Sequence, residues 1–163
     1  MSTPNLLVRL AITLVVIWLA GREGIPGAVA QTGDVAVVVN DKNPVDSLSR
    51  PELRKIFAGE KRSWPGSLPI KLFVRTPGAR ERATLLRLLG MSESEYKEYW
   101  SAKVFRGEAQ TEPNGLPSNG MQKEAIAAYP GAVALVNIQD VKPGMKVVKV
   151  EGHKPGEAGY PLN

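Results

Sequence analysis

The sequence predicts one α/β domain, a three-layer-like arrangement in which helices cover a small mixed sheet. Short runs rich in β-branched residues alternate along the chain with segments whose apolar residues recur at helical spacing. The length of 163 residues fits a single domain with a core of ordinary size. We find no internal repeat or low-complexity tract that would favour another architecture.

The first expected strand and helix lie before residue 60. Residues 34–40 contain the run VAVVV, which is typical of a buried strand. Ser49 and Glu52 form a capping-box pattern, and apolar residues follow at helical spacing. Gly59 stands where a helix commonly ends. We therefore expect a strand, a loop and a short amphipathic helix.

The rest of the chain continues this alternation. Ser92 and Glu95 repeat the capping-box pattern, so two helices are expected on either side of the turn at Gly90. Residues 108–118 are polar and rich in Gly, Pro and Asn, so we expect a loop there. The expected elements, in order, are a strand at 70–74, helices at 79–89 and from 92, a helix at about 120–129, and strands at 132–136 and 145–150.

The amino-terminal segment has the pattern of a secretory signal. One basic residue precedes an uninterrupted apolar run, and small residues end the segment at 28–30. We expect residues 1–30 to be a signal peptide cleaved near Ala30, and the mature protein to be periplasmic or secreted. A retained anchor is the alternative, although the apolar run is short for a membrane span. Residues 31–150 then form the domain, and residues 151–163 form a flexible tail.

Composition excludes several functional classes. The chain has no cysteine, so it can form no disulfide, thiolate nucleophile or Cys-rich zinc site. His153 is the single histidine, which leaves no triad or second metal ligand near it in the sequence. The net charge of +5 comes from scattered Lys and Arg residues, which does not indicate nucleic-acid binding. We therefore expect no enzyme activity, no metal and no cofactor.

Three groups of residues occur in an order and spacing that resemble a known family. They are Asn43-Pro44-Val45 with Ser47-Leu48-Ser49, Leu53-Arg54-Lys55-Ile56-Phe57 with Gly59 and Trp64-Pro65, and Pro130-Gly131-Ala132-Val133. The chain resembles the small, single-domain relatives of the phosphate-binding proteins of ABC-type uptake systems, within the type 2 periplasmic binding protein superfamily. This resemblance implies an α/β domain equivalent to about one lobe of a two-lobed receptor.

The resemblance also implies candidate ligand-binding residues. In the full-length receptors, a Gly-Ser-Gly-Thr-Arg-like segment opens a helix and grips phosphate, and a second helix start faces the same ligand. Two hydroxyl donors of that pattern are lost here, because Ala79 and Glu81 stand at the serine and threonine positions. The corresponding residues are Arg75, Thr76, Gly78, Ala79 and Arg82 in the first segment and Ser118, Asn119 and Gly120 in the second.

Alternatives stay open at both segments. Arg82 lies on the helix stripe expected to face the core, so it needs an external oxyanion, a carboxylate of the protein such as Glu81, or a path to solvent. Ser118 and Asn119 fit simple helix capping as well as ligand contact.

The leading functional hypothesis is an exported, phosphate-receptor-like binding protein that takes a small oxyanion for transport or sensing. The alternative is a ligand-free interaction or scaffolding domain that retained one binding-protein lobe. Expected partners are an ABC permease, another envelope protein, or a second copy in a homodimer. Such partners are expected because one lobe alone exposes the face that its companion lobe would cover.

Overall fold

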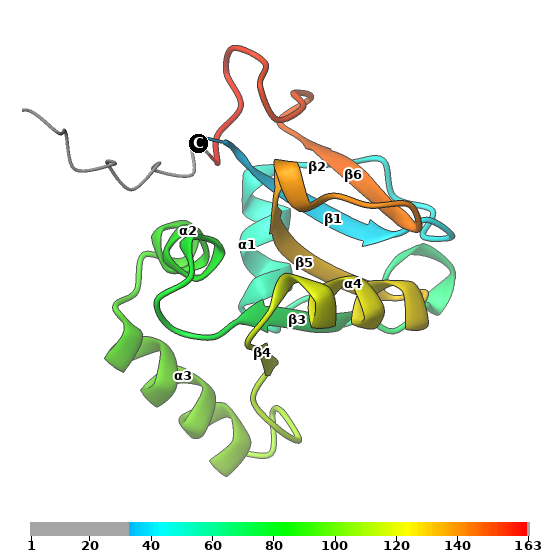
Figure 1. Ribbon diagram of the computed structural model, residues 1–163. Helices are drawn as coiled ribbons and strands as arrows, with labels where there is room; N and C mark the ends of the chain where they lie inside the picture. Colours follow the sequence, from blue (N-terminus) through cyan, green and yellow to red (C-terminus); the bar gives the residue numbers. More distant parts are fainter. Residues whose placement is uncertain (1–32, 163) are drawn as a thin grey trace, which may run out of the picture. The chain divides into compact units, whose positions relative to one another are not determined.

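A six-stranded mixed sheet organises residues 33–162, the part of the chain that this computed structural model describes (Figure 1). The expected signal peptide and its cleavage site lie outside the described residues. None of the described helices is both long and apolar enough to cross a membrane. The elements are β1 (Val35–Asn40), β2 (Ser47–Leu48), α1 (Arg50–Phe57), η2 (Pro65–Ser67), β3 (Lys71–Arg75), α2 (Arg80–Leu89), α3 (Glu93–Phe105), β4 (Asn114–Leu116), α4 (Asn119–Ala128), β5 (Ala132–Asn137), η3 (Ile138–Asp140) and β6 (Met145–Val150).

The sheet topology places several strand ends together. The strands run in the order β2-β6-β1-β5-β3-β4. β1 pairs antiparallel with β5 and β6, whereas β3 pairs parallel with both β5 and β4. Parallel strands bring their carboxyl ends to the same end of a sheet. The starts of α2 and α4, which follow β3 and β4, therefore lie near one another and near the end of β5.

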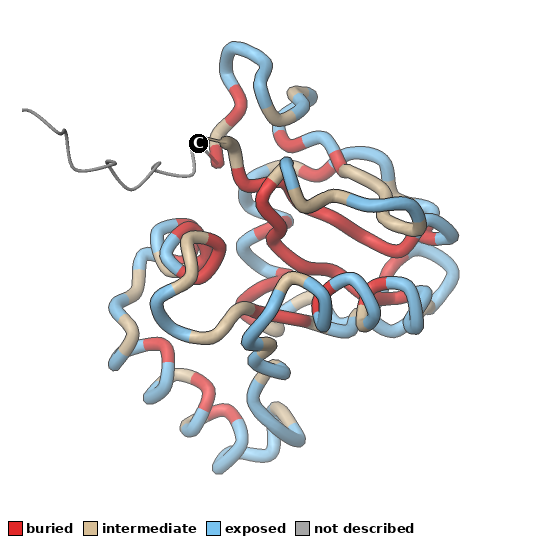
Figure 2. Tube along the Cα trace, viewed as in Figure 1, coloured by how far each residue is buried: buried red, intermediate tan, exposed pale blue. Residues whose placement is uncertain are grey.

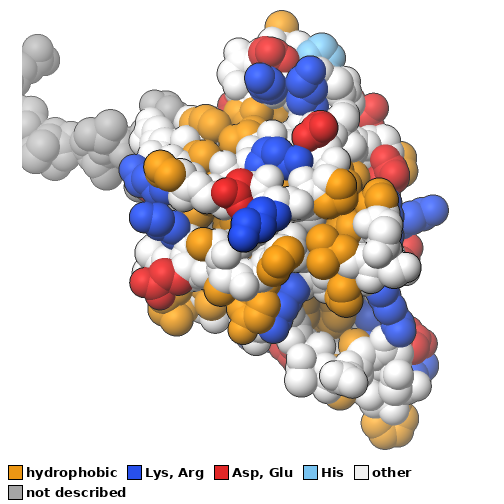
Figure 3. Space-filling view, turned by 90° about the vertical axis from the view of Figure 1, so that its right-hand side faces the viewer, with side chains coloured by type: hydrophobic (Ala, Val, Ile, Leu, Met, Phe, Trp, Pro, Cys, Tyr) orange, Lys and Arg blue, Asp and Glu red, His pale blue; other side chains and the backbone are white. Residues whose placement is uncertain are grey.

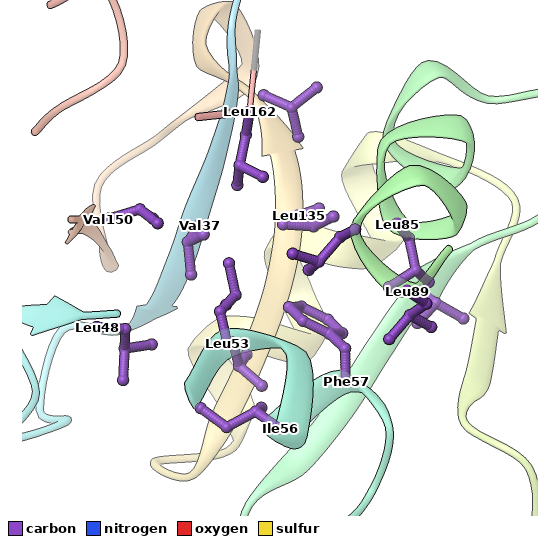
Figure 4. Packing of buried hydrophobic residues seen from close by; sticks show 14 of the residues in the cluster. Val37, Leu48, Leu53, Ile56, Phe57, Leu85, Leu89, Leu135, Val150 and Leu162 are labelled. Atoms are coloured by element: carbon purple, nitrogen blue, oxygen red, sulfur yellow. The ribbon is translucent and has the colours of Figure 1, made fainter. Parts of the chain in front are cut away.

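Helices cover both faces of the sheet, which confirms the expected α/β layers. Alternate residues of β1 belong to two separate apolar clusters, one containing residues of α1 and α2 and the other containing Ile126 of α4. Because both faces are buried, the strand reads as a continuous apolar run rather than an alternating one. Figure 2 shows the buried strands at the centre and exposed outer surfaces of the helices. Figure 4 shows the first cluster, with Leu53, Ile56 and Phe57 of α1 and Leu85 and Leu89 of α2 packed beside Val37 and Leu135.

The helix starts follow the predicted capping boxes. The Ser49 side chain accepts a hydrogen bond from the Glu52 N–H, and the Glu52 carboxylate accepts one from the Ser49 N–H. Ser92 and Glu95 make the same reciprocal pair at the start of α3. Each box satisfies backbone donors that the first helical turn leaves without a partner. Helices α1 and α3 therefore begin where the capping boxes predicted.

Two short strands were not expected. β2 exists through its parallel pairing with β6, and β4 through its parallel pairing with β3. β4 lies inside residues 108–118, where the composition indicated only loop. Segments of two or three residues carry no periodicity of their own, so their pairing partners decide whether they are strands.

The last described residues, 151–162, lie in the segment that the sequence indicated as a flexible tail, and part of this segment contacts β1. No regular helix or strand forms between residues 151 and 162, yet Tyr160 and Leu162 are each only 3% exposed. The Tyr160 hydroxyl donates to the Val35 carbonyl at 2.7 Å, and the Leu162 carbonyl accepts from the Val35 N–H at 3.4 Å. The segment therefore packs against the start of β1.

Replacing Tyr160 by Phe is expected to lower the free energy of unfolding by about 1 to 2 kcal/mol, because a buried carbonyl would lose its donor. Burial raises the pKa of Tyr160, so the hydroxyl keeps its proton and remains a donor at neutral pH. The matched control is Tyr129→Phe, because the Tyr129 side chain is 43% exposed. Urea unfolding of both variants tests this, and equal stabilities would contradict an anchoring role for Tyr160.

Candidate functional site

The two helix-starting segments singled out in the sequence meet at the carboxyl ends of β3 and β4. Arg75, the last residue of β3, pairs in register with Leu116, the last residue of β4. Its guanidinium donates from Nε to the Leu116 carbonyl at 3.1 Å and from Nη2 to the Pro117 carbonyl at 3.1 Å. The Thr76 N–H donates to the same Leu116 carbonyl at 3.3 Å. Arg75 and Thr76 thus join the loop before α2 to the loop before α4.

The loop before α2 presents backbone rather than side-chain donors. Gly78 is exposed and has a φ of 91°, a conformation that favours glycine, and a Cβ there would meet nothing within 4 Å. Ala79 is the N-cap of α2 and makes no side-chain capping bond. The first N–H groups of a helix have no intrahelical acceptor, and the helix dipole makes this end positive. The loop therefore has the local chemistry of a weak anion seat.

The start of α4 uses its side chains for capping. Ser118 is the N-cap, and its hydroxyl accepts from the Met121 N–H at 3.2 Å. The Asn119 amide donates to a carboxylate oxygen of Asp140, while the Asn119 Oδ1 is buried without a hydrogen-bond partner in the described structure. Gly120 is exposed. Of the two alternatives for this segment, helix capping is the one that Ser118 shows in the structure.

Arg82 is paired within the protein, not directed at the two loops. Its guanidinium donates to both carboxylate oxygens of Glu93 in α3, from Nε at 3.0 Å and from Nη2 at 2.6 Å. It also lies over the ring of Tyr96, 3.9 Å from the centroid. Hydrogen bonds from Arg82 lower the pKa of Glu93, and burial raises the pKa of Tyr96 to about 12. Of the alternatives for Arg82, pairing with a carboxylate of the protein is the one observed.

The carboxylate of Glu81 lies beside Arg75, the other arginine of the site, and partly neutralises its positive charge. Its side chain is buried, and Oε1 accepts from the Asn137 N–H at 3.3 Å. The same oxygen lies 4.0 Å from Nη1 of Arg75. Asn137 ends β5, so this contact ties α2 to the carboxyl end of the sheet. A carboxylate at this distance reduces the attraction that Arg75 could exert on an anion in the adjoining loops.

Sequence reasoning missed Glu93 as the partner of Arg82. The Glu93 side chain is 31% exposed and joins α3 to α2. The sequence held one indication of this contact: the turn between the two helices is short, so the first turn of α3 must lie close to α2. Nothing in the local pattern distinguishes Glu93 from Glu95 or Glu98, because the choice depends on the angle between the helices.

A groove lies at the opposite end of the sheet from these loops. It has a volume of about 520 Å³ and is lined by the first residues of β3, the turn before β5, the loop before β4, and the aromatic rings of Trp100 and Tyr129. Lys71 lies over the Tyr129 ring at 3.7 Å from its centroid. No candidate residue from the sequence lines this groove, within the range that the structure describes. Figure 3 shows one face, where Lys and Arg side chains are dispersed among hydrophobic patches.

A comparison with protein families matches residues 28–161 to a family described as a PBP superfamily domain, where PBP stands for periplasmic binding protein. The chain belongs to the PBP superfamily. This match covers most of the chain and confirms the family that the sequence resembled.

Solved structures similar to this PBP superfamily chain include phosphate-receptor proteins that are longer than it. An ABC-type phosphate transport receptor from Vibrio cholerae is 23% identical with a TM-score of 0.61, over 76% of this chain and 48% of the receptor. A putative phosphate ABC transporter substrate-binding protein with bound phosphate from Clostridium perfringens is 18% identical with a TM-score of 0.61. This match covers 75% of this chain and 46% of that protein. PstS from Borrelia burgdorferi is 14% identical with a TM-score of 0.54, and the match covers 80% of this chain and 49% of PstS. At these identities the likeness establishes the fold: the chain spans about half of each receptor.

Proposed function

We propose that this PBP superfamily chain is a one-lobed, phosphate-receptor-like binding protein that holds a small oxyanion at the paired loops 76–79 and 118–120. The observation that carries the proposal is the junction made by Arg75, which brings two helix starts to the carboxyl ends of adjacent parallel strands. Ligands of open α/β sheets bind at such strand ends. The family and the fold of the phosphate receptors support a binding role.

The proposed ligand is held by backbone N–H groups and by the Thr76 hydroxyl. Neither Arg75 nor Arg82 is available as a full counter-charge, because Glu81 lies beside the first and Glu93 binds the second. One lobe also supplies only half of the shell that a two-lobed receptor closes over its ligand. We therefore expect a dissociation constant near 1 mM, which corresponds to about −4 kcal/mol.

We further propose that residues 1–30 direct export and are cleaved near Ala30, so that the protein works in the periplasm or outside the cell. The apolar run and the small residues before position 31 support this. An ABC permease or another envelope protein is then the expected partner, in keeping with the transport receptors that share the fold. The comparisons give no support to a homodimer.

A specific observation favours a second candidate function, a ligand-free interaction domain. Both arginines that the resemblance assigned to phosphate are occupied by carboxylates of the protein itself. A lobe that lost its ligand would keep such internal pairs and use the exposed face for a protein partner instead.

Calorimetric titration of the purified protein with phosphate and sulfate tests the proposed site. Replacing Glu81 by Gln removes the carboxylate charge beside Arg75 but keeps an oxygen that can accept from the Asn137 N–H. Removing one negative charge close to the loops should raise phosphate affinity about fivefold, or about 1 kcal/mol. The matched control is Glu98→Gln, which removes the same charge from an exposed position on α3 and should leave the affinity unchanged.

No heat with either anion at about 10 mM, ten times the expected dissociation constant, would reject oxyanion binding for wild type and E81Q alike. If E81Q and E98Q raise the affinity for phosphate equally, the affinity depends on the net charge of the protein and not on a site at the loops. Either outcome would favour the ligand-free interaction domain.

A further inference from the structure

Two Asn-Gly dipeptides lie close together in the sequence, Asn114-Gly115 inside β4 and Asn119-Gly120 at the start of α4. No other asparagine of the sequence precedes a glycine. In such a pair the backbone nitrogen of glycine can attack the side-chain carbonyl carbon of asparagine, because glycine has no side chain to block the approach. The fold restrains the two pairs differently, so we expect them to differ in reactivity.

The side chain of Asn119 is held in place. Its amide donates to a carboxylate oxygen of Asp140, and its Oδ1 is buried. Asn119 and Gly120 both lie in the first turn of α4, where the helix fixes the backbone angles between them. Ring closure at this pair would therefore have to break the contact with Asp140 and unwind the start of the helix.

The side chain of Asn114 has no such restraint. Asn114 is exposed, and within the part of the chain that the structure describes its side-chain amide makes no hydrogen bond. The residue lines the groove of about 520 Å³ at the start of β3, so water can reach it. Gly115 is exposed as well. Both reacting groups of this pair are therefore accessible to solvent.

The position of β4 in the sheet directs the Gly115 nitrogen outward. β4 is an edge strand of only three residues. The Leu116 carbonyl accepts from the Thr76 N–H, so Leu116 faces β3, and alternate residues of a strand direct their backbone groups to opposite sides. The Gly115 N–H therefore faces the open edge. A short edge strand opens locally at low cost, and the opened backbone lets this nitrogen turn toward the Asn114 side chain.

We propose that Asn114 is a site of spontaneous covalent modification, where asparagine converts through a succinimide to aspartate and isoaspartate. Solvent hydroxide removes the proton of the Gly115 N–H, and the nitrogen forms a bond to Cγ of Asn114. The C–N bond of the side-chain amide breaks, and its NH2 group takes a proton from water and leaves as ammonia. Water then adds to either carbonyl of the imide and opens the ring. The net change is the loss of ammonia and the gain of water.

The isoaspartyl product changes the backbone of β4. Its chain runs through the former side chain, which adds one carbon to the backbone and shifts Leu116 out of its register with Arg75. The Leu116 carbonyl would then lose the hydrogen bonds from the Arg75 Nε and the Thr76 N–H. Modification of Asn114 therefore separates the paired loops. Its effect on anion binding rests on the proposed function, whereas the modification itself does not.

The test incubates the purified protein at mildly alkaline pH and follows its tryptic peptides by mass spectrometry. One peptide, residues 107–123, contains both Asn-Gly pairs, and fragmentation assigns any gain in mass to Asn114 or to Asn119. The same incubation in concentrated urea measures the two asparagines without the fold. An isoaspartate-specific methyltransferase labels the isoaspartyl product.

Gly115→Ala is the variant, because a methyl group beside the attacking nitrogen hinders ring closure. A Cβ on Gly115 would lie 3.7 Å from Cγ2 of Thr76, an ordinary contact that the fold accommodates. Gly120→Ala is the matched control at the other pair, where a Cβ meets only the Ser118 hydroxyl oxygen at 3.8 Å. The comparison of Asn114 with Asn119 in wild type needs no variant, so the test holds even if G115A fails to fold.

We expect Asn114 to convert at least about tenfold faster than Asn119 in the folded protein, and the two rates to agree within about threefold in urea. G115A should slow the conversion of Asn114 at least about tenfold, and G120A should leave it unchanged. Equal rates at the two asparagines in the folded protein would overturn the proposal. Conversion of Asn114 in urea alone, or at the same rate in G115A as in wild type, would overturn it as well.

Amide hydrogen exchange of the isoaspartyl form, followed by phosphate titration, separates this proposal from the proposed function. The Thr76 N–H should lose its protection, because its acceptor on Leu116 is displaced. A Thr76 N–H that stays protected would overturn the predicted separation of the loops. If protection is lost but the affinity for phosphate is unchanged, the anion does not bind at the paired loops, and the modification of Asn114 stands without that site.

Discussion

Replacing Glu93 by Ala is expected to lower the free energy of unfolding by about 3 kcal/mol, because it leaves the guanidinium of Arg82 buried without its counter-charge. The Arg82 side chain is 7% exposed and makes two hydrogen bonds to Glu93, so the loss removes charge and acceptors together. The ring of Tyr96, which covers the guanidinium, cannot replace a carboxylate. Urea unfolding at neutral pH measures the effect, with Glu98→Ala as an exposed control expected to change stability by less than about 0.5 kcal/mol.

The converse variant, Arg82→Met, should be less harmful. Glu93 is 31% exposed, so without Arg82 its carboxylate can turn to water, and a methionine can pack against Tyr96. This asymmetry separates a buried ion pair from a surface one, in which both truncations would cost little. If E93A proves no less stable than E98A, the guanidinium must reach solvent, and Arg82 would again be free to meet an anion.

The pair also predicts how the difference between wild type and E93A depends on pH. Hydrogen bonds from Arg82 hold the pKa of Glu93 below its ordinary value of 4.5. A lowered pKa means that the carboxylate stabilises the folded state above pH 4.5, and that this contribution is lost as the pH falls through the folded-state pKa. The stability gap between wild type and E93A should therefore be full at pH 7 and shrink below pH 4.5.

Replacing Gly131 by Ala is expected to abolish the native fold, with a loss of at least about 4 kcal/mol. A Cβ at this position would lie 1.8 Å from the backbone carbonyl oxygen of Pro69, which is much shorter than any contact between non-bonded heavy atoms. The backbone cannot easily move away, because the Gly131 carbonyl accepts from the Lys71 N–H at 2.9 Å and from the Trp64 indole at 3.0 Å. Since domains of this size have about 5 to 15 kcal/mol of stability, most molecules would unfold.

The control for Gly131 is Gly120→Ala. A Cβ on Gly120 would meet only the Ser118 hydroxyl oxygen at 3.8 Å, an ordinary contact, and alanine favours a helix over glycine. Circular dichroism during heating should show G120A melting at or above the wild-type temperature and G131A without a cooperative transition. A folded G131A would mean that the turn before β5 can separate from the start of β3.

Much of the site prediction came from the resemblance to phosphate receptors and not from the local sequence pattern. The two predicted segments lie together because β3 pairs in parallel with β4. Residues 41 or more positions apart in the sequence, such as Arg75 and Leu116, meet because both end strands of the same direction. The resemblance implied that the two loops share a ligand, and the register brings them together. It could not reveal that Glu81 would turn toward Arg75, because that contact also needs the end of β5.

The sequence by itself determined what depends on neighbours along the chain. Both predicted capping boxes form, and the apolar runs form buried strands, because a cap or a run needs only a few consecutive residues. Only the tertiary structure decided that Glu93 receives Arg82, that Tyr160 closes the start of β1, and that β4 exists at all. The reason is physical: each of these depends on a partner in another element, and a partner's position follows from packing rather than from any local pattern.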